Sequence, residues 1–328
     1  MPDTINTEAL LSEIQAATDD YVFNRQPEDI YFKSNVLLYR LLSQGKTYNG
    51  GLKLQANLEY GKSNTGSYGP KSLMPVNKKE IITSAFFTYG AYFATLTIDM
   101  NDQLLNSGEE AKINLVKAKI DNAQKSIRDT MGSEVYGKRN QLIIDSGDPN
   151  ALPFIGLGDM FNSDSSVPYG EIKEDDLYLW AANVIAAEKT MSFAFMQELR
   201  RTASTDTTRE GKPDLYLTTE ELQDAFERTL QPQARYSDKA LINAGFENVL
   251  FKGASIVADD NQAEGTIDGL NTKYLQIKSH KDRNFTAPKW QSPIRQPDTM
   301  TANIRWAGQL LCTNRKAHAR ASNVIPPA

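Results

Sequence analysis

One stretch restricts the possible folds of this chain more than any other: residues 106–137, which read NSGEEAKINLVKAKIDNAQKSIRDTMGSEVYG. Ser107 and Glu110 have the spacing of a capping box, and Gly137 is a suitable stop for a helix. We therefore predict one helix over residues 107–136, and its span from about 108 to 136 would be roughly 43 Å long at 1.5 Å per residue. Its apolar side chains recur at steps of three or four and form one stripe: Ile113, Val116, Ile120, Ala123, Ile127, Met131 and Val135.

An apolar stripe of this kind must pack against another apolar surface to be buried. An ordinary surface helix and part of a coiled coil are the alternative interpretations. The stripe is too short for a free-standing coiled coil, so we expect the helix to pack on a sheet of its own chain.

Residues 47–98 have the pattern of a long β-hairpin. Leu52, Leu54, Ala56 and Leu58 alternate with polar residues, which is the two-residue period of a half-exposed strand. The turn-rich residues 61–70 form the tip, and the chain returns through the uncharged residues 81–98. That run is long enough for a membrane span, but its β-branched and aromatic residues favour strands. An isolated ribbon is marginal in water, so we expect it to contact a neighbour; a surface loop is the alternative.

The remaining segments mix helices and strands without regular βαβ alternation, which indicates an α+β fold. We expect a short amphipathic helix at residues 7–22 and an apolar segment at 36–42 that lies against another part of the chain. Residues 174–199 predict one or two helices, with Trp180 on the apolar side. A short strand at 215–217 precedes a helix that ends at Pro232. Further strands are predicted at 249–251, 255–258, 273–279 and 301–314.

The composition is that of a globular protein, with 328 residues, 40% apolar residues and a net charge of −5. Asp3 and Glu8 stand where a signal peptide would need positive charge, and a single cysteine, Cys312, excludes an internal disulfide framework and fits a reducing cytoplasm.

Charge is unevenly distributed along the chain. Residues 1–45 carry three basic and seven acidic residues, residues 46–80 six and two, and residues 273–328 ten and two. A basic end can indicate nucleic-acid binding, but the basic residues are scattered and the whole chain is acidic. Complementary contact between copies of the chain is the favoured interpretation.

Sequence patterns typical of an active site are weak. The two histidines, His280 and His318, have no metal-ligand spacing, and Cys312 with His318 matches no known nucleophile signature. A part-buried strand cysteine is the favoured interpretation of Cys312. Gly156 and Gly158 lack the third glycine of a nucleotide-binding loop. A group of oxygen-bearing side chains could hold a hard cation, although a solvated acidic turn is favoured: Asp259, Asp260, Asn261, Glu264 and Asp268.

Several motifs resemble those of tailed-bacteriophage major capsid proteins with the Hong Kong 97-type fold. Within residues 213–259, PDLYLTTEELQDAF is similar to a strand-then-helix segment of that family, and GFENVLFKGASIVAD to its "Gly-Phe … Phe-Lys-Gly … Val-Val" pattern. Residues 271–275 (NTKYL) and 308–316, with Gly308-Gln309-Leu310 and Asn314-Arg315-Lys316, resemble two later strands. Family members often have proline where Ala254 and Ser255 stand here, so the local bend is expected to differ.

The resemblance implies a domain plan. It comprises an N-terminal arm at residues 1–46, an extended E-loop at 47–80, a peripheral domain at 81–140 and 273–300 that carries the spine helix 107–136, and an axial domain at 141–272 and 301–328. Residues 280–296 correspond to the P-loop near three-fold contacts. Some relatives carry an N-terminal scaffolding segment, for which the position of the E-loop leaves no room. Some crosslink their subunits, for which Lys71 would be the donor, but no acceptor matches.

The resemblance also implies a function. The chain is expected to be a non-enzymatic shell subunit without catalytic, metal-binding or cofactor-binding residues. Copies would form hexamers and pentamers of a bacteriophage head around double-stranded DNA, which they contact weakly and non-specifically. A portal and a separate scaffolding protein would take part, and the shell would assemble in the host bacterial cytoplasm without a membrane. An encapsulin-type compartment shell, a nucleic-acid-binding protein using the basic C-terminal region, and an enzyme with a site between chains are the alternatives.

The charge pattern predicts where copies meet. We expect the E-loop of one subunit to lie on acidic surface of its neighbour, at the arm or the start of the spine helix. The predicted E-loop contacts are Lys53, Lys62, Tyr68, Lys71 and Lys78. The predicted acidic contacts are Asp19, Asp20, Glu109 and Glu110, and those of the P-loop are Lys281, Arg283, Lys289 and Trp290.

Overall fold

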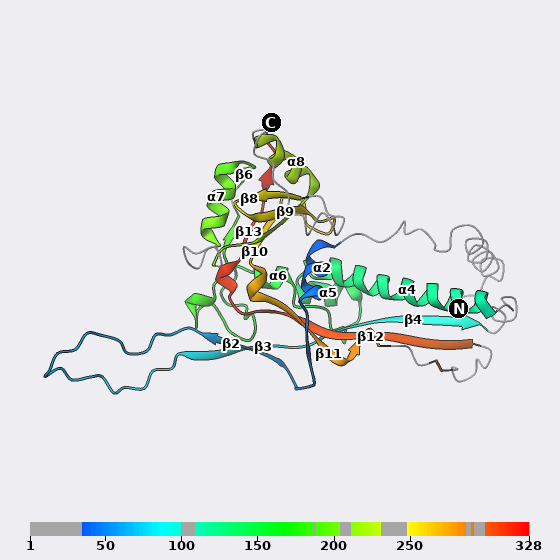
Figure 1. Cartoon of the computed structure of the whole chain (residues 1–328), viewed down its shortest axis with the longest axis horizontal. Helices are drawn as coiled ribbons and strands as arrows, with labels where there is room; N and C mark the ends of the chain where they lie inside the picture. The colour runs from blue at the N-terminus through cyan, green and yellow to red at the C-terminus, as the bar shows by residue number, and fades with distance from the viewer. Residues whose placement is uncertain are drawn as a thin grey trace.

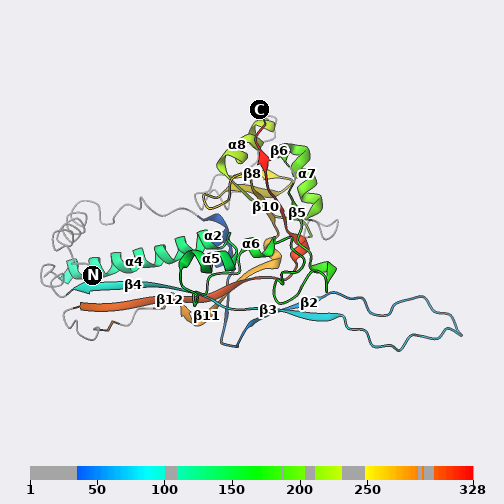
Figure 2. The same ribbon diagram turned by 180° about the vertical axis from the view of Figure 1, so that it is seen from behind.

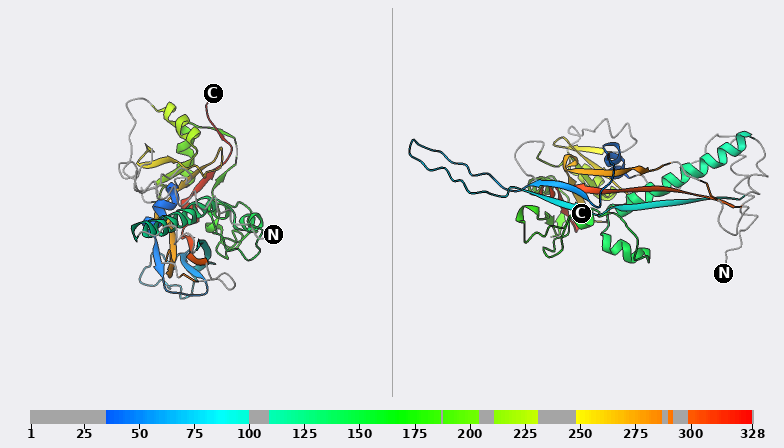
Figure 3. Two further views of the ribbon diagram at one scale, coloured as in Figure 1. Left: turned by 90° about the vertical axis from the view of Figure 1, so that its right-hand side faces the viewer. Right: turned by 90° about the horizontal axis from the view of Figure 1, so that it is seen from below.

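The computed structural model describes residues 35–99, 109–186, 188–203, 211–230, 248–286, 290–291 and 299–327, with the backbone alone at 109–116 and 248. The molecule is a long bar with an upright body (Figure 1). One end of the bar is the β2–β3 hairpin, the other is formed by α4, β4 and β12, and the body carries α7 and α8. Seen from below, the hairpin and α4 extend to opposite ends of the molecule (Figure 3).

A four-stranded sheet, here called the spine sheet, forms the middle of the bar. Its order is β1-β11-β12-β4. The strands are β1 (Lys46–Tyr48), β11 (Leu275–Asn284), β12 (Thr299–Cys312) and β4 (Gly90–Asp99). β12 and β4 pair without interruption from Thr299 opposite Asp99 to Gly308 opposite Gly90. The buried side chains of both strands face α4, so this sheet forms one side of the largest core.

The predicted long helix is confirmed as α4 (Glu109–Glu134). Ala123, Ile127, Met131 and Val135 of its stripe are buried, and Ile120 is partly buried against the same core. The helix ends before Gly137 because the carbonyl of Val135 accepts the N–H of Leu157, at 2.7 Å, in place of a helical partner. The side chains of Ile113 and Val116 lie outside the described residues.

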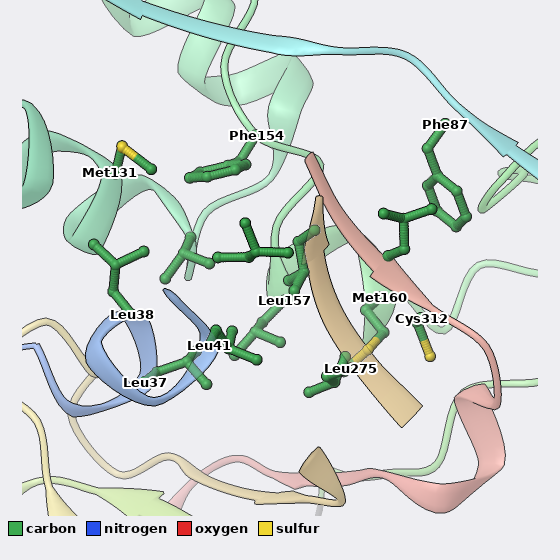
Figure 4. Close-up of a cluster of buried hydrophobic side chains, with 14 of the residues drawn as sticks. Leu37, Leu38, Leu41, Phe87, Met131, Phe154, Leu157, Met160, Leu275 and Cys312 are labelled. Atoms are coloured by element: carbon green, nitrogen blue, oxygen red, sulfur yellow. The ribbon is translucent and has the colours of Figure 1, made fainter. Parts of the chain in front are cut away.

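The apolar segment at 36–42 is the helix α2 (Val36–Ser43), and it packs against α4 and β11 as expected. Leu37, Leu38 and Leu41 meet Met131 of α4 and Leu275 of β11 in the cluster of Figure 4. Asn35 caps the helix by accepting the N–H of Leu38 at 2.6 Å and donates to the carbonyl of Gly132 at 2.9 Å. The helix predicted at residues 7–22 lies outside the described residues.

The single hairpin predicted over residues 47–98 is wrong in its second arm. β2 (Leu54–Glu59) pairs with β3 (Ile82–Phe87), from Leu54 opposite Phe87 to Glu59 opposite Ile82. The chain then leaves the hairpin, and residues 90–99 join the spine sheet as β4. This arrangement is favourable because it buries Tyr92, Leu96 and Ile98, which a two-stranded ribbon would leave in water.

The body contains a six-stranded sheet of order β5-β13-β10-β7-β9-β8. The strands are β5 (Val184–Ile185), β13 (Ala319–Ala321), β10 (Ile267–Leu270), β7 (Leu215–Thr218), β9 (Ala254–Ala258) and β8 (Asn248–Phe251). The helices α7 (Phe193–Thr202) and α8 (Glu220–Thr229) pack in a second core with Tyr216 of β7. Leu215 and Leu217 point to the first core, so this sheet joins the two cores.

The prediction of helices over residues 174–199 is wrong before residue 193. These residues form a 3-10 turn, η1 (Tyr178–Trp180), and the short strands β5 and β6 (Lys189–Thr190). Trp180 is buried and donates its indole N–H to the carbonyl of Tyr169 at 2.9 Å. These residues form strands because β5 pairs with β13 and β6 pairs with β14 (Val324–Ile325). The periodicity of the sequence does not reveal such long-range partners.

The smaller elements connect the bar to the body. They are α5 (Arg139–Ser146), α6 (Leu157–Met160), η3 (Thr272–Tyr274) and η4 (Arg315–Ala317). Sequence analysis grouped residues 301–328 with 141–272, but β12 lies beside β4, and only the segment after Cys312 returns to the six-stranded sheet. None of the helices in the described ranges is both long and apolar enough to cross a membrane.

Candidate assembly interface

The root of the β2–β3 hairpin is built into the fold. Leu54, Ala56 and Leu58 are buried while the residues between them are exposed, which confirms the predicted alternation over β2, but Leu52 precedes the strand and is 90% exposed. The N–H of Phe86 donates to the carbonyl of Gly170 at 2.9 Å. Gly170 has a φ of +62°, and a Cβ there would lie 2.8 Å from the Cβ of Ala85, so the close approach requires glycine.

Beyond its root the hairpin becomes an extended loop, residues 60–81, which we call the hairpin loop. The last bond of the ladder joins the N–H of Tyr60 to the carbonyl of Ile81 at 2.9 Å. Farther out, Asn64 donates its side-chain amide to the carbonyl of Asn77 at 2.9 Å. The loop projects away from the body (Figure 1). Nothing in the described part of the chain covers its outer residues.

Apolar side chains stand exposed on the hairpin loop. Leu73 is 98% exposed, Val76 94% and Tyr68 72%. Burying side chains of this size is worth about 1.5–3 kcal/mol each, so full exposure favours contact with another molecule. Tyr68 is one of the predicted contacts, whereas Leu73 and Val76 are not, although the apolar Leu-Met-Pro-Val run inside a polar loop is a visible signal in the sequence.

The predicted basic contacts are only partly on this loop. Lys62, Lys71 and Lys78 are exposed along it. Lys53 lies at the root, where it forms an ion pair with Glu171 of its own chain. Of the predicted acidic contacts, Asp19 and Asp20 lie outside the described residues, and Glu109 and Glu110 lie in the first turn of α4 with undescribed side chains.

Two of the predicted P-loop residues lie in a strand. β11 continues to Asn284, so Lys281 and Arg283 lie in the strand with exposed side chains. Trp290 is half-buried and packs against the first core, and Lys289 lies outside the described residues. A contact with α4 stabilises the end of β11. Phe285 directly follows the strand, and the guanidinium of Arg128 in α4 lies 5.3 Å from its ring centre.

The predicted acidic turn is wrong for two of its members. Asp260 and Glu264 are exposed, but Asp259 and Asp268 are buried. Asp259 accepts hydrogen bonds from the Tyr136 hydroxyl at 2.8 Å and from the N–H of Val36 at 3.1 Å. Burial raises the pKa of Asp259, although the N–H of Asn261 and the Tyr136 hydroxyl oppose this.

Asp268 forms a paired ionic contact with Arg320, with N–O distances of 2.6 and 2.7 Å. No group of histidine, cysteine and acidic side chains in the described ranges is arranged to hold a metal ion. The two buried carboxylates instead join α2, the end of α4 and the six-stranded sheet, a role that spacing in the sequence did not reveal.

A buried arginine, Arg315, positions the segment that holds the hairpin root. Its guanidinium donates to the Glu174 carboxylate at 2.7 Å and to the carbonyls of Trp180 and Asn162 at 3.0 and 2.7 Å. These bonds satisfy a charge that would otherwise be costly to bury. Arg315 therefore orders residues 160–180, which include Gly170 and Glu171 at the root. The Asn-Arg-Lys motif was the signal for it in the sequence.

The weak active-site candidates have structural explanations. Burial raises the pKa of the Cys312 thiol to about 12 and lowers the pKa of His318 to about 3, so both are neutral at pH 7. Cys312 is the last residue of β12 and is fully rather than partly buried. A Cβ at Gly156 would lie 2.5 Å from the Val135 carbonyl oxygen, so the Gly-x-Gly pair permits close packing of α6 on the end of α4.

No protein-family profile and no curated protein sequence matches the chain. Solved structures are similar to it over nearly its whole length. The capsid subunit of cyanophage A-1(L) superposes with a TM-score of 0.70 at 14% identity, covering 91% of this chain and 95% of that one. The chain has the Hong Kong 97-type capsid fold.

Two further structures widen the range of proteins with this capsid fold. The head of Helicobacter pylori bacteriophage KHP40 gives a TM-score of 0.58 at 7% identity, covering 93% of this chain and 94% of that one. The holo-SrpI encapsulin complex from Synechococcus elongatus PCC 7942 gives 0.59 at 10% identity, covering 95% and 96%. In the capsid fold, α4 is the spine helix expected from the sequence and the hairpin loop is the outer part of the expected E-loop.

Proposed function

We propose that this chain is the major capsid protein of a tailed bacteriophage, a structural and non-enzymatic subunit that assembles with copies of itself into the icosahedral head. The observation that carries the proposal is the shared fold with the cyanophage A-1(L) capsid subunit over 91% of the chain. The hairpin loop supports it independently, because nothing in the described part of the chain covers Leu73 and Val76. A second copy would supply that cover.

In the proposed shell the copies form hexamers and pentamers around double-stranded DNA. The loop of one subunit lies on its neighbour, with Lys62, Lys71 and Lys78 near acidic surface. DNA contact is weak and non-specific, and a portal and a separate scaffolding protein take part. The shell belongs to the virion and is assembled in the host bacterial cytoplasm.

The test is electron microscopy of the full-length chain after expression in bacteria. Closed icosahedral particles support the proposal, and a monomer at all concentrations and salt conditions overturns it. If particles require a scaffold, the chain should still form rings of five or six copies, which sedimentation velocity resolves from a monomer.

A compartment shell of the encapsulin type is the second candidate, because the SrpI encapsulin shares the fold with a TM-score of 0.59. The contents of particles from the producing cells separate the two. Nuclease-protected double-stranded DNA of uniform length supports a phage head, whereas one enclosed protein species without protected DNA supports a compartment.

A further inference from the structure

Two lysines stand directly opposite one another in the spine sheet. β1 and β11 are parallel, and their register pairs Lys46 with Lys278. Like charges in directly opposite positions of a sheet destabilise the pairing. On its other side Lys278 is opposite Gln309 of β12, so neither lateral neighbour is acidic. No ion pair in the described part of the chain involves either lysine.

The surroundings of the lysine pair are also basic. β1, β11 and β12 together contain one acidic residue, Asp282, against five basic ones: Lys46, Lys278, Lys281, Arg283 and Arg305. Lys46 is exposed and Lys278 half-buried. An unneutralised cluster of this kind is unfavourable for the isolated subunit, and an anionic partner would offset the repulsion.

Aromatic rings border the pair but leave no platform for bases. Tyr48 is opposite His280, with ring centres 5.1 Å apart in an edge-on arrangement. The other neighbour of Tyr48 is Tyr89, which stacks on it at 5.3 Å with an interplanar angle of 2°. Because the rings pack on one another, fewer ring faces are open for the bases of a single-stranded nucleic acid to stack on. The net charge of −5 also opposes binding of a polyanion and favours a protein partner.

The chain itself carries a matching acidic segment at the hairpin root. In residues 171–176, Glu171 pairs with Lys53 and Glu174 with Arg315, so both are used within the subunit. Asp175 and Asp176 are exposed and have no ion pair among the described residues. Other exposed acidic residues include Glu220 and Glu221 on α8, at the top of the body and away from β11 (Figure 1).

We propose that Lys46 and Lys278 of one copy bind Asp175 and Asp176 of a neighbouring copy. The contact is heterologous: a different surface of each copy takes part, as in a closed ring. This inference rests on the proposed function, because it requires copies side by side.

The decisive experiment is a charge exchange. The variant Lys46→Glu with Lys278→Glu should raise the protein concentration needed for particles or rings roughly five-fold or more at low salt, since exposed pairs are weak individually. Adding Asp175→Lys and Asp176→Lys should restore assembly. The matched control adds Glu220→Lys and Glu221→Lys instead and should not restore it. Rescue by the α8 control, or no effect of the first variant, would overturn the contact.

A second measurement distinguishes an interface from a structural role. Lys278→Gln removes the like-charge repulsion, so the isolated subunit should unfold at the same or a higher temperature while assembly weakens. A loss of both would mean that Lys278 supports the fold. If the double variant does not fold, Lys46→Glu alone takes its place in the assembly measurement, because Lys46 is exposed. A wild-type chain that never assembles fails the proposed function, whereas wild-type particles with unaffected variants fail this contact alone.

Discussion

Two arms of the molecule differ in where their apolar side chains go. The spine helix α4 extends from one end of the bar and the hairpin loop from the other (Figure 2). Ile127 and Met131 of α4 are at most 2% exposed, whereas Leu73 and Val76 of the loop are more than 90% exposed. The first arm contributes its burial to the stability of the subunit. The described part of the chain does not bury Leu73 and Val76 of the second arm, so we expect the contribution of their burial to come from another molecule.

The comparison predicts its largest effect in the core below α4. Ile127→Asp places an ionisable group where the side chain is 2% exposed, and it should lower the free energy of unfolding by at least about 4 kcal/mol. Asn122→Asp, at an exposed position of the same helix, is the control and should change it little. Thermal unfolding and soluble yield measure both. Folded Ile127→Asp at normal yield would show that this face of α4 is not core.

Deleting residues 62–71 tests the other arm. The deletion shortens the hairpin loop but removes none of the β2–β3 ladder, so the unfolding temperature should not change. Closed particles should be lost completely, because the exposed loop residues no longer reach a neighbour. Electron microscopy and sedimentation give the readout. Normal particles from the deletion variant would break the comparison, since the loop would then have no role in assembly.

pH should act on the body of the molecule and not on the loop. Burial lowers the pKa of His318 from 6.5 to about 3, so between these values the unfolded chain binds a proton that the folded chain does not. The free energy of unfolding therefore falls as the pH falls from 6.5 to 3, by up to roughly 1.4 kcal/mol per unit from this group.

The control for the pH prediction is His318→Asn. Nδ1 of His318 accepts a hydrogen bond from the N–H of Asn271 at 3.1 Å, and the side-chain oxygen of asparagine can accept the same N–H. Asp259, Asp159 and Glu134 have pKa values raised by burial and act in the opposite direction, so the difference between the two proteins isolates the histidine. Parallel stability curves for the two proteins between pH 6 and 4 would contradict the prediction.

The smallest expected effect concerns the charges of the loop. Reversing Lys62, Lys71 and Lys78 to glutamate removes contacts that are worth no more than about 1 kcal/mol each. Particle yield should fall most at low salt, where the Debye length is about 30 Å at 0.01 M. Reversing the exposed Lys117, Lys138 and Arg228 changes the net charge equally and serves as the control. A yield independent of salt would leave the apolar residues as the basis of the loop contact.

The sequence by itself determined the elements whose signal is local. The stripe from Ala123 to Val135 predicted α4, and the alternation from Leu54 to Leu58 predicted β2, because periods of 3.6 and 2 record which face is buried. The expectation that the hairpin contacts a neighbour rests on the marginal stability of an isolated ribbon and stays a prediction.

Only the tertiary structure decided which distant segments meet. Residues 90–99 look like the return arm of a hairpin, but they pair with β12, which lies about two hundred residues later in the chain. The carboxylates of Asp259 and Asp268 resemble a solvated turn until Tyr136, Val36 and Arg320 are brought to them. The opposition of Lys46 and Lys278 exists only through the parallel register of β1 and β11. Each of these features depends on contacts between segments far apart in the sequence, and the local pattern of residues contains no information about such contacts.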